Sequence, residues 1–184
     1  MRLVILGGPG AGKGTQSHLL CQRFQIREIA TGNILRTALA DTNSELGQQA
    51  REYVERGDLV PDATMIQLVR QHITQPEVTS GWLLEGYPRT AFQAEELDFL
   101  LDDLQQRLTQ AIYIEVPDAV MLERSLTRAR LDDTPDAIQR RIDAFHARTK
   151  PMLDYYEFRQ YLLRVDGSQP IAQVQAEILK KLEV

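Results

Sequence analysis

Residues that commonly build disulfides, metal centres or nucleophilic triads are scarce in this chain of 184 residues. The one cysteine, Cys21, cannot form an internal disulfide, and a lone thiol excludes a zinc site made from paired cysteines. The histidines show neither metal-ligand spacing nor a triad pattern; they are His18, His72 and His146. We therefore predict no metal ion held by protein ligands and no thiol or histidine nucleophile.

Long hydrophobic runs and a positive net charge are also missing. No stretch approaches the roughly 18 apolar residues of a membrane-spanning helix, and the N-terminal residues lack the pattern of a secretory signal. The net charge of −5 argues against general affinity for nucleic acid or for an anionic membrane surface. We expect a cytoplasmic protein, and the length suits one compact domain with its own core.

Lysine is rare among the basic residues. Of the 21 lysines and arginines, only Lys13, Lys150, Lys180 and Lys181 are lysines. Arginine carries a planar guanidinium whose paired N–H groups match phosphate oxygens. The bias towards arginine hints at a phosphate-bearing ligand.

Short apolar runs alternate with helical patterns along the chain, which predicts an α/β sandwich with a five-stranded parallel sheet. Each run is short enough for a strand and ends near a glycine or a turn residue. The expected strands cover residues 2–6, 27–30, 82–86, 111–116 and 161–165. The expected helices outside the insert described next cover residues 13–24, 62–73, 90–104, 118–128, a long segment from 134 that Pro151 should break or kink, and a last helix after residue 170.

The connection between the second and third strands is too long for one crossover helix. Its pattern predicts helices near residues 31–40, 44–56 and 62–73. We therefore expect one P-loop domain over residues 1–184 with a helical insert. The predicted core comprises residues 1–30, 61–127 and 134–184, with the insert at 31–60 and a very short lid at 128–133.

The stretch "GGPGAGKGT" at residues 7–15 carries the spacing G-x-x-x-x-G-K between an apolar strand and a helix. Glycines allow the backbone to wrap around an anion with several N–H groups pointing inward. The following helix adds the positive end of its dipole, and Lys13 can reach the outer phosphates. Gly14 follows the lysine and the hydroxyl comes one place later, at Thr15, so a direct bond from this hydroxyl to magnesium is less certain than in a P-loop GTPase.

Five motifs occur in the order, and at about the spacing, of the adenylate kinase family, and they cover nearly the whole chain. They are "GGPGAGKGTQ" (7–16), "ATGNILR" (30–36), "GDLVPD" (57–62), "EGYPRTAFQ" (85–93) and "VDGSQP" (165–170). The sequence thus resembles a short-lid adenylate kinase, an enzyme that transfers the terminal phosphoryl group of Mg-ATP to AMP and yields two ADP. Such a transfer needs positioning and positive charge in a dry site rather than a protein nucleophile.

The resemblance implies a role for each matching residue. The ATP phosphates would be bound by Gly10, Ala11, Gly12, Lys13, Gly14 and Thr15, and the backbone at Gln169 would meet the ATP base. AMP would be bound by Thr31, Arg36, Asp58, Leu59, Val60, Gly86, Tyr87, Pro88, Arg89 and Gln93, with Arg36 and Arg89 on its phosphate and Gln93 on the adenine edge. Thr31 could also cap the helix that follows, and Tyr87 could serve packing.

The lid is the main departure from the family. Arg124 and Arg128 match a first pair of arginines, and Arg128 would lie over ATP. Arg130 precedes "LDD", as the phosphate-bridging arginine does, yet only Ala129 separates it from Arg128. Arg141 matches a further arginine on the AMP side. The resemblance thus implies five catalytic residues, which are Lys13, Arg89, Arg124, Arg130 and Arg141. The division of roles between Arg128 and Arg130 stays open.

Two smaller departures concern the magnesium ion. Glu85 stands where the family usually has aspartate, and Asn33 replaces another aspartate. By resemblance, Mg²⁺ would arrive with ATP and be held mostly through phosphates and water, with the carboxylate orienting those waters. Neither departure should abolish activity.

Three alternatives remain. Another nucleoside monophosphate kinase would share the chemistry, although "ATGN" and "YPRTAFQ" favour AMP. A nucleotide-responsive binding protein without turnover is suggested only by the short lid and Asn33. A P-loop NTPase that drives a partner lacks a typical acidic strand end. We expect ATP, AMP and ADP as partners, no nucleic acid, no membrane, and a monomer.

Overall fold

The chain folds around a five-stranded parallel sheet, and the computed structural model describes residues 1–128, 130 and 133–183. The strands are β1 (Arg2–Leu6), β2 (Arg27–Ala30), β3 (Trp82–Glu85), β4 (Gln110–Glu115) and β5 (Leu162–Asp166). Their spatial order is β2-β3-β1-β4-β5, and every neighbouring pair is parallel. The predicted fold class is confirmed, with strand ends displaced by one residue at most.

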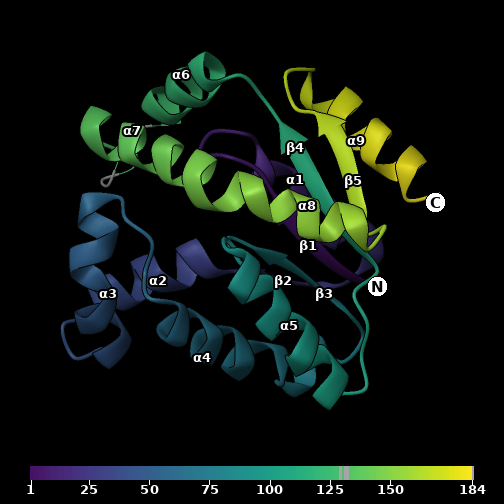
Figure 1. Cartoon of the computed structure of the whole chain (residues 1–184), viewed down its shortest axis with the longest axis horizontal. Coiled ribbons are helices and arrows are strands. Elements are labelled where there is room, and N and C mark those ends of the chain that lie inside the picture. The colour runs from purple at the N-terminus through teal and green to yellow at the C-terminus, as the bar shows by residue number, and fades with distance from the viewer. Residues whose placement is uncertain (129, 131–132, 184) are drawn as a thin grey trace.

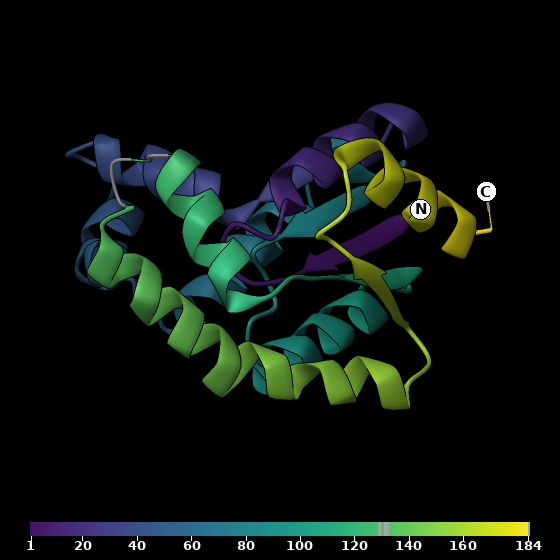
Figure 2. The ribbon, with the colours of Figure 1, turned by 90° about the horizontal axis from the view of Figure 1, so that it is seen from above.

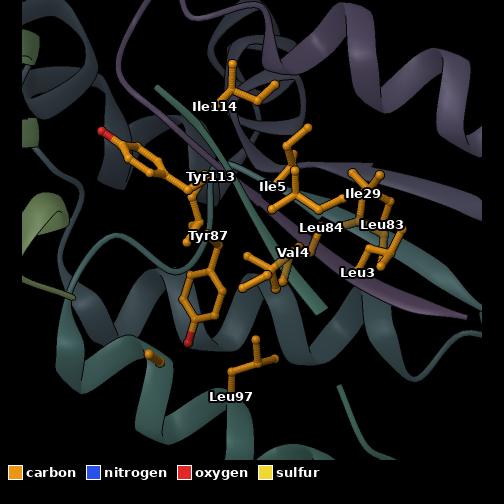
Figure 3. Close-up of a cluster of buried hydrophobic side chains, with 14 of the residues drawn as sticks. Leu3, Val4, Ile5, Ile29, Leu83, Leu84, Tyr87, Leu97, Tyr113 and Ile114 are labelled. Atoms are coloured by element: carbon orange, nitrogen blue, oxygen red, sulfur yellow. The ribbon is translucent and has the colours of Figure 1, made fainter. Parts of the chain in front are cut away.

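Central strands are buried on both faces, as their unbroken apolar runs predict. Leu3 and Val4 of β1 are fully buried, and Leu3 stands in register with Leu83 of β3 and Gln110 of β4. Figure 3 shows Leu3, Val4, Leu83 and Leu84 close together on β1 and β3, with Leu97 nearby. This core holds the glycine-rich segment after β1 in the middle of the sheet's edge.

Helices cover both faces of the sheet. The α-helices are α1 (Lys13–Phe24), α2 (Thr31–Ala40), α3 (Glu45–Arg56), α4 (Asp62–Ile73), α5 (Ala91–Asp103), α6 (Asp118–Arg128), α7 (Pro135–Ala144), α8 (Lys150–Phe158) and α9 (Ile171–Lys181). Short helical segments are η1 (Pro76–Val78) and η2 (Phe145–Thr149). In Figure 2, α1 and α9 lie above the sheet, and α5 and α8 lie below it.

Two helix pairs extend beyond the sheet at the same end of the molecule. Figure 1 shows α2 and α3 below and α6 and α7 above, on the left of the view. The pair α2 and α3 pack against each other, and α6 packs against α7. The helices predicted within the long connection are confirmed as α2, α3 and α4, while the division into core, insert and lid stays a prediction. Within the proposed lid, residues 129, 131 and 132 lie outside the described part of the chain.

The long helix was expected to break or kink at Pro151, and it does not break there. α7 passes into the π-helical segment η2, and α8 continues directly with Pro151 in its first turn. Figure 2 shows the three segments as one curved rod. Proline is tolerated in the first turn because its missing N–H would have no partner within the helix, and the wider π turn supplies a register shift just before it. None of the helices among the described residues is long and apolar enough to cross a bilayer.

Candidate active site

The carboxyl ends of the five strands lie at one edge of the sheet, because all the strands are parallel. Ligands of such sheets bind outside these ends, where the strand order changes direction. The predicted site motifs follow β1, β2, β3 and β5 directly, at Gly7, Thr31, Gly86 and Gly167. The parallel sheet therefore collects segments that are far apart in the sequence.

The glycine-rich segment wraps tightly between β1 and α1. Gly10 and Gly12 have φ of 72° and 97°, which favours glycine over any other residue. A Cβ at Gly10 would lie 2.6 Å from the backbone oxygen of Met121 in α6, whereas a Cβ at Gly12 would meet no atom within 4 Å. Gly10 thus allows the segment to pack against α6, and Gly12 provides the left-handed turn before α1.

Lys13 is the first residue of α1 and folds back over the glycine-rich segment. Its Nζ donates to the backbone oxygens of Gly7 at 2.8 Å and Gly8 at 2.7 Å. Desolvation lowers the pKa of Lys13 to about 8; Glu85 opposes that shift, and Arg89 reinforces it. An anion placed here would stabilise the charged ammonium.

A cavity opens beside the glycine-rich segment, and cations dominate its wall. Among the described residues that line it, the cations are Lys13, Arg36, Arg89, Arg128, Arg130 and Arg141, and the carboxylates are Asp58 and Glu85. The chain as a whole carries a net charge of −5. The positive charge is therefore concentrated at the cavity, as a site for a polyanion requires.

Mutual repulsion and burial strain this cationic cluster. Desolvation lowers the pKa of Arg89, and Arg141 and Arg36 add to the effect, with Glu85 opposing it. Desolvation also lowers the pKa of Arg130, and Arg36 and Arg128 contribute. A ligand with several phosphates would relieve both effects, since each guanidinium can bind phosphate oxygens through paired N–H groups.

Asp133, between α6 and α7, organises arginines at the end of α6 and beyond it. Its side chain is 0% exposed and binds the Arg128 guanidinium through Nε and Nη2, at 3.0 to 3.1 Å. Nη1 of Arg141 donates to the same carboxylate at 2.8 Å, and the backbone N–H of Arg130 donates to it at 3.2 Å. One buried carboxylate thus holds three predicted site residues in one cluster.

The cavity lining also includes mostly uncharged predicted residues. They are Asp58, Leu59 and Val60, together with Gly86, Pro88 and Gln93. Gln93 lies near the start of α5, and it is only 1% exposed. The Nε2 of Gln93 donates to Oδ1 of Asp62 at 2.6 Å, and its Oε1 accepts from the Arg89 backbone N–H at 2.7 Å.

Thr31 and Tyr87 point into the protein rather than lining the cavity. Thr31 is fully buried, and its hydroxyl donates to the Glu85 backbone oxygen at 3.1 Å. Thr31 is the first residue of α2 and not its N-cap, which is Ala30; the capping alternative is wrong. Tyr87 is buried among core side chains (Figure 3), and its hydroxyl donates to the Gln93 backbone oxygen.

A second group of predicted residues lies beside the cavity. Arg124 donates through Nη1 to the Gly167 backbone oxygen at 2.9 Å and so joins α6 to the segment after β5. The Nε2 of Gln169 donates to Glu177 at 2.7 Å and to the Asp166 backbone oxygen. The remaining predicted residues of this group belong to the glycine-rich segment and the start of α1; they are Gly10, Ala11, Gly12, Gly14 and Thr15.

Several residues at the cavity escaped the sequence analysis. Thr149 lines the cavity and donates through its hydroxyl to the Arg89 backbone oxygen at 3.0 Å, and Phe145 lines the cavity at the start of η2. Asp62 and Asp133 act through their contacts with Gln93 and the arginines. Asp133 lay in the quoted "LDD" and Asp62 in "GDLVPD", but neither motif showed which side chain they would bind.

Glu85 provides the carboxylate that could face a magnesium ion. It ends β3, lines the cavity, and its Oε2 lies 3.5 Å from where a Cβ on Gly14 would stand. No group of three or more potential metal ligands gathers among the described residues. One carboxylate near the glycine-rich segment would suit an ion bound chiefly by nucleotide phosphates and water.

Comparison with known proteins identifies relatives along the full chain. A sequence model described as Adenylate kinase matches residues 5–161. Adenylate kinase 2 of Nostoc sp. (strain PCC 7120 / SAG 25.82 / UTEX 2576) is 53% identical over 184 residues, which is the full length of both chains. Adenylate kinase 2 of Synechocystis sp. (strain ATCC 27184 / PCC 6803 / Kazusa) is 53% identical over 182 residues, covering 99% of this chain and 100% of the relative. Adenylate kinase of Caldicellulosiruptor bescii (strain ATCC BAA-1888 / DSM 6725 / KCTC 15123 / Z-1320) is 37% identical over 215 aligned positions, covering 100% of each chain, so this relative contains residues without a counterpart here.

Proposed function

Because this chain belongs to the adenylate kinase family, whose members transfer a phosphoryl group reversibly between adenine nucleotides, we propose how its own residues divide the work. Mg-ATP and AMP would bind at the edge of the sheet with their phosphates facing each other in the cationic cavity. The observation that carries this assignment is the gathering of six cations, from Lys13 to Arg141, around one cavity beside the glycine-rich segment.

ATP would lie against the glycine-rich segment and α6. The backbone N–H groups from Gly10 to Thr15 and the ammonium of Lys13 would bind its phosphates. The backbone at Gln169 would meet the base of ATP, and Arg124 joins α6 to this segment after β5. This arrangement is supported by the close packing of Gly10 on Met121, which leaves room for backbone but not for a side chain.

AMP would occupy the wall formed by α2, α5 and the segment before α4. Arg36 and Arg89 would bind its phosphate, while Asp58, Leu59 and Val60 would surround its base together with Gln93. Thr31, Gly86, Tyr87 and Pro88 would shape this wall. The Arg89 guanidinium is already oriented, because its Nε donates to the Gly86 backbone oxygen at 2.8 Å.

The transfer itself requires no protein nucleophile or base. An oxygen of the AMP phosphate would form a bond to the terminal phosphorus of ATP, the bond from that phosphorus to the departing ADP oxygen would break, and two ADP would result. Arg128, Arg130 and Arg141 would neutralise the charge that spreads over the migrating group. A closed arrangement must exclude water, since hydrolysis would otherwise compete with transfer.

Magnesium fits the donor set as an ion carried by ATP. When bound, Mg²⁺ neutralises phosphate charge and helps to align the reacting oxygens. Glu85 is the residue that would orient its waters, and Asn33 accepts a hydrogen bond of 2.7 Å from Arg36 instead of adding a second carboxylate there. We propose in addition that the protein acts as a monomer in the cytoplasm, as its resemblance to short-lid adenylate kinases implies.

One rate measurement tests the proposal. The purified protein is incubated with ATP and with AMP, CMP, UMP or GMP, with and without magnesium, and ADP formation is followed. We expect turnover with AMP that depends on magnesium, and its loss in Lys13→Met but not in Lys150→Met, where an exposed lysine outside the cavity is changed. Absence of ADP formation by the intact protein would support the binding-protein alternative, and preference for another acceptor would identify a different nucleoside monophosphate kinase.

A further inference from the structure

The Gln93 amide is held by two partners that each allow only one orientation. Gln93 belongs to α5, is almost fully buried, and still lines the cavity. Its Nε2 donates to the Asp62 carboxylate at 2.6 Å, and its Oε1 accepts from the Arg89 backbone N–H at 2.7 Å. A carboxylate only accepts hydrogen bonds and a backbone N–H only donates them, so a flipped amide would face repulsion at both ends.

A side-chain amide has two N–H donors and two acceptor positions on its oxygen. Asp62 accepts from one N–H of the amide, and the Arg89 backbone N–H donates to one acceptor position of its oxygen. The amide therefore has one N–H donor and one acceptor position left for a ligand in the cavity. The two protein partners determine which end of the amide is the nitrogen and which is the oxygen. The direction in which the remaining donor and acceptor face the ligand is thus determined by Asp62 together with the Arg89 backbone N–H, and of these two only Asp62 is a side chain that a substitution can change.

We infer that Asp62 is a specificity-determining positioning residue, which locks the Gln93 amide so that the cavity accepts a 6-amino purine and rejects a 6-oxo purine. This inference rests on the proposed function, in which Gln93 reads the base of the acceptor nucleotide. Asp62 itself reads no base in this scheme. It acts only by removing the second orientation of the amide.

The discrimination follows from the hydrogen-bonding edges of the two bases. Adenine offers a donor at N6 and an acceptor at N1, which match the oxygen and the N–H of an amide in one orientation. Hypoxanthine offers an acceptor at O6 and a donor at N1, so it needs the flipped amide. Buried groups that are left unpaired or opposed are costly, and a site built around such groups rejects the wrong substrate strongly.

Asp62 also has a structural position that must be separated from this role. It is the first residue of α4, where a carboxylate interacts favourably with the positive end of the helix dipole. Loss of that interaction would lower stability and could reduce activity with every acceptor equally. A purely structural role would therefore leave the selectivity between two acceptors unchanged, whereas the positioning role would change it.

The test compares AMP with inosine monophosphate, its 6-oxo analogue, as acceptors for ATP. The measured quantity is the ratio of kcat/KM for the two acceptors in the wild type and in two variants. Asp62→Asn keeps the shape but can donate to a flipped amide, and we expect the AMP preference to fall by roughly 10- to 100-fold, the loss of one hydrogen bond to a charged group. Asp62→Glu keeps an acceptor-only carboxylate, so it should retain more of the preference than the isosteric amide does.

Asp136→Asn is the matched control, because Asp136 is an exposed aspartate in the first turn of α7. It should leave the acceptor ratio unchanged. Calorimetric binding of AMP and of inosine monophosphate to the same proteins, without ATP, gives a second readout that is independent of turnover. It should show the same loss of selectivity in Asp62→Asn.

The outcomes separate the inference from the function on which it rests. A wild type that makes no ADP from ATP and AMP overturns the proposed function. A wild type that is active and prefers AMP, together with a folded Asp62→Asn variant whose acceptor ratio is unchanged, overturns the role of Asp62 alone. An equal loss with both acceptors would assign Asp62 a purely structural role and would likewise overturn it.

Discussion

The buried carboxylate of Asp133 accepts a hydrogen bond of 2.8 Å from Nη1 of Arg141, eight residues further along the chain. The same carboxylate binds the Arg128 guanidinium, so the last residue of α6 and an arginine in the last turn of α7 are brought together. A carboxylate in this place offers the guanidinium groups the same kind of oxygen pair that a phosphate would offer. We therefore propose that Asp133 couples the stability of the fold to the binding of nucleotide phosphates.

Replacement of this carboxylate should destabilise the protein and change its response to nucleotide. In Asp133→Asn the charge that faces Arg128 and Arg141 is lost, and we expect the free energy of unfolding to fall by about 1–3 kcal/mol. Chemical denaturation measures this change, with Asp154→Asn at an exposed position of α8 as the control. ATP should stabilise the variant more than the wild type, since phosphate oxygens can replace the lost carboxylate; equal stabilisation would contradict the coupling.

Arg130 should be needed for turnover as a guanidinium and not only as a positive charge. Lysine keeps the charge but cannot bind two phosphate oxygens through a planar pair of N–H groups. We expect Arg130→Lys to lower kcat by about 100-fold or more, on the scale of a lost transition-state donor. Arg140→Lys is the control, because Arg140 is an exposed residue of α7 that donates to the Arg56 backbone oxygen. Turnover near the wild-type value in Arg130→Lys would remove this residue from the mechanism.

Affinity for ATP should weaken as the pH rises through the pKa of Lys13. Burial lowers that pKa to about 8 in the nucleotide-free protein, so the ammonium is charged below pH 8 and increasingly neutral above it. Because phosphates bind the charged form, the Kd for ATP should increase by up to roughly tenfold per pH unit above pH 8, the effect of one linked proton. Calorimetric titrations between pH 7.5 and 9.5 check this dependence. Lys13→Met should bind weakly with little change over the same range, and a steep dependence in that variant would point to another group.

The two left-handed glycines before α1 should differ in their tolerance of a side chain. Gly12→Ala meets open space but must adopt φ near 97°, which costs roughly 1–2 kcal/mol. Gly10→Ala adds an approach of 2.6 Å to the Met121 backbone oxygen, so its free energy of unfolding should fall further. Gly14→Ala, within α1, should be neutral or stabilising, because alanine is the better helix former. Denaturation midpoints of the three variants test this order, and a Gly12→Ala variant less stable than Gly10→Ala would refute it.

Local patterns in the sequence were sufficient for most of the fold. The strand at 2–6 is a run of apolar residues that ends at glycine, and the helix from Pro135 begins where Thr134 supplies a cap, as its hydroxyl does for the Ala137 N–H. Such features depend on neighbouring residues, so their physical causes are present in a short stretch of chain. Pro151 shows the limit of this reasoning, since the local pattern did not predict the π-helical segment that precedes it.

The sequence by itself determined the alternation of strands and helices, the glycine-rich turn around an anion and the set of arginines available to phosphates, because each depends on residue type and local spacing. Only the tertiary structure decided which side chains meet. Asp62 of α4 and Gln93 of α5 are joined by a hydrogen bond between two helices that are separated in the chain. Asp133 binds arginines that precede and follow it in the sequence. Contacts of this kind follow from the packing of whole elements, in which a one-residue shift of a helix turns a side chain by about 100° and exchanges its partner.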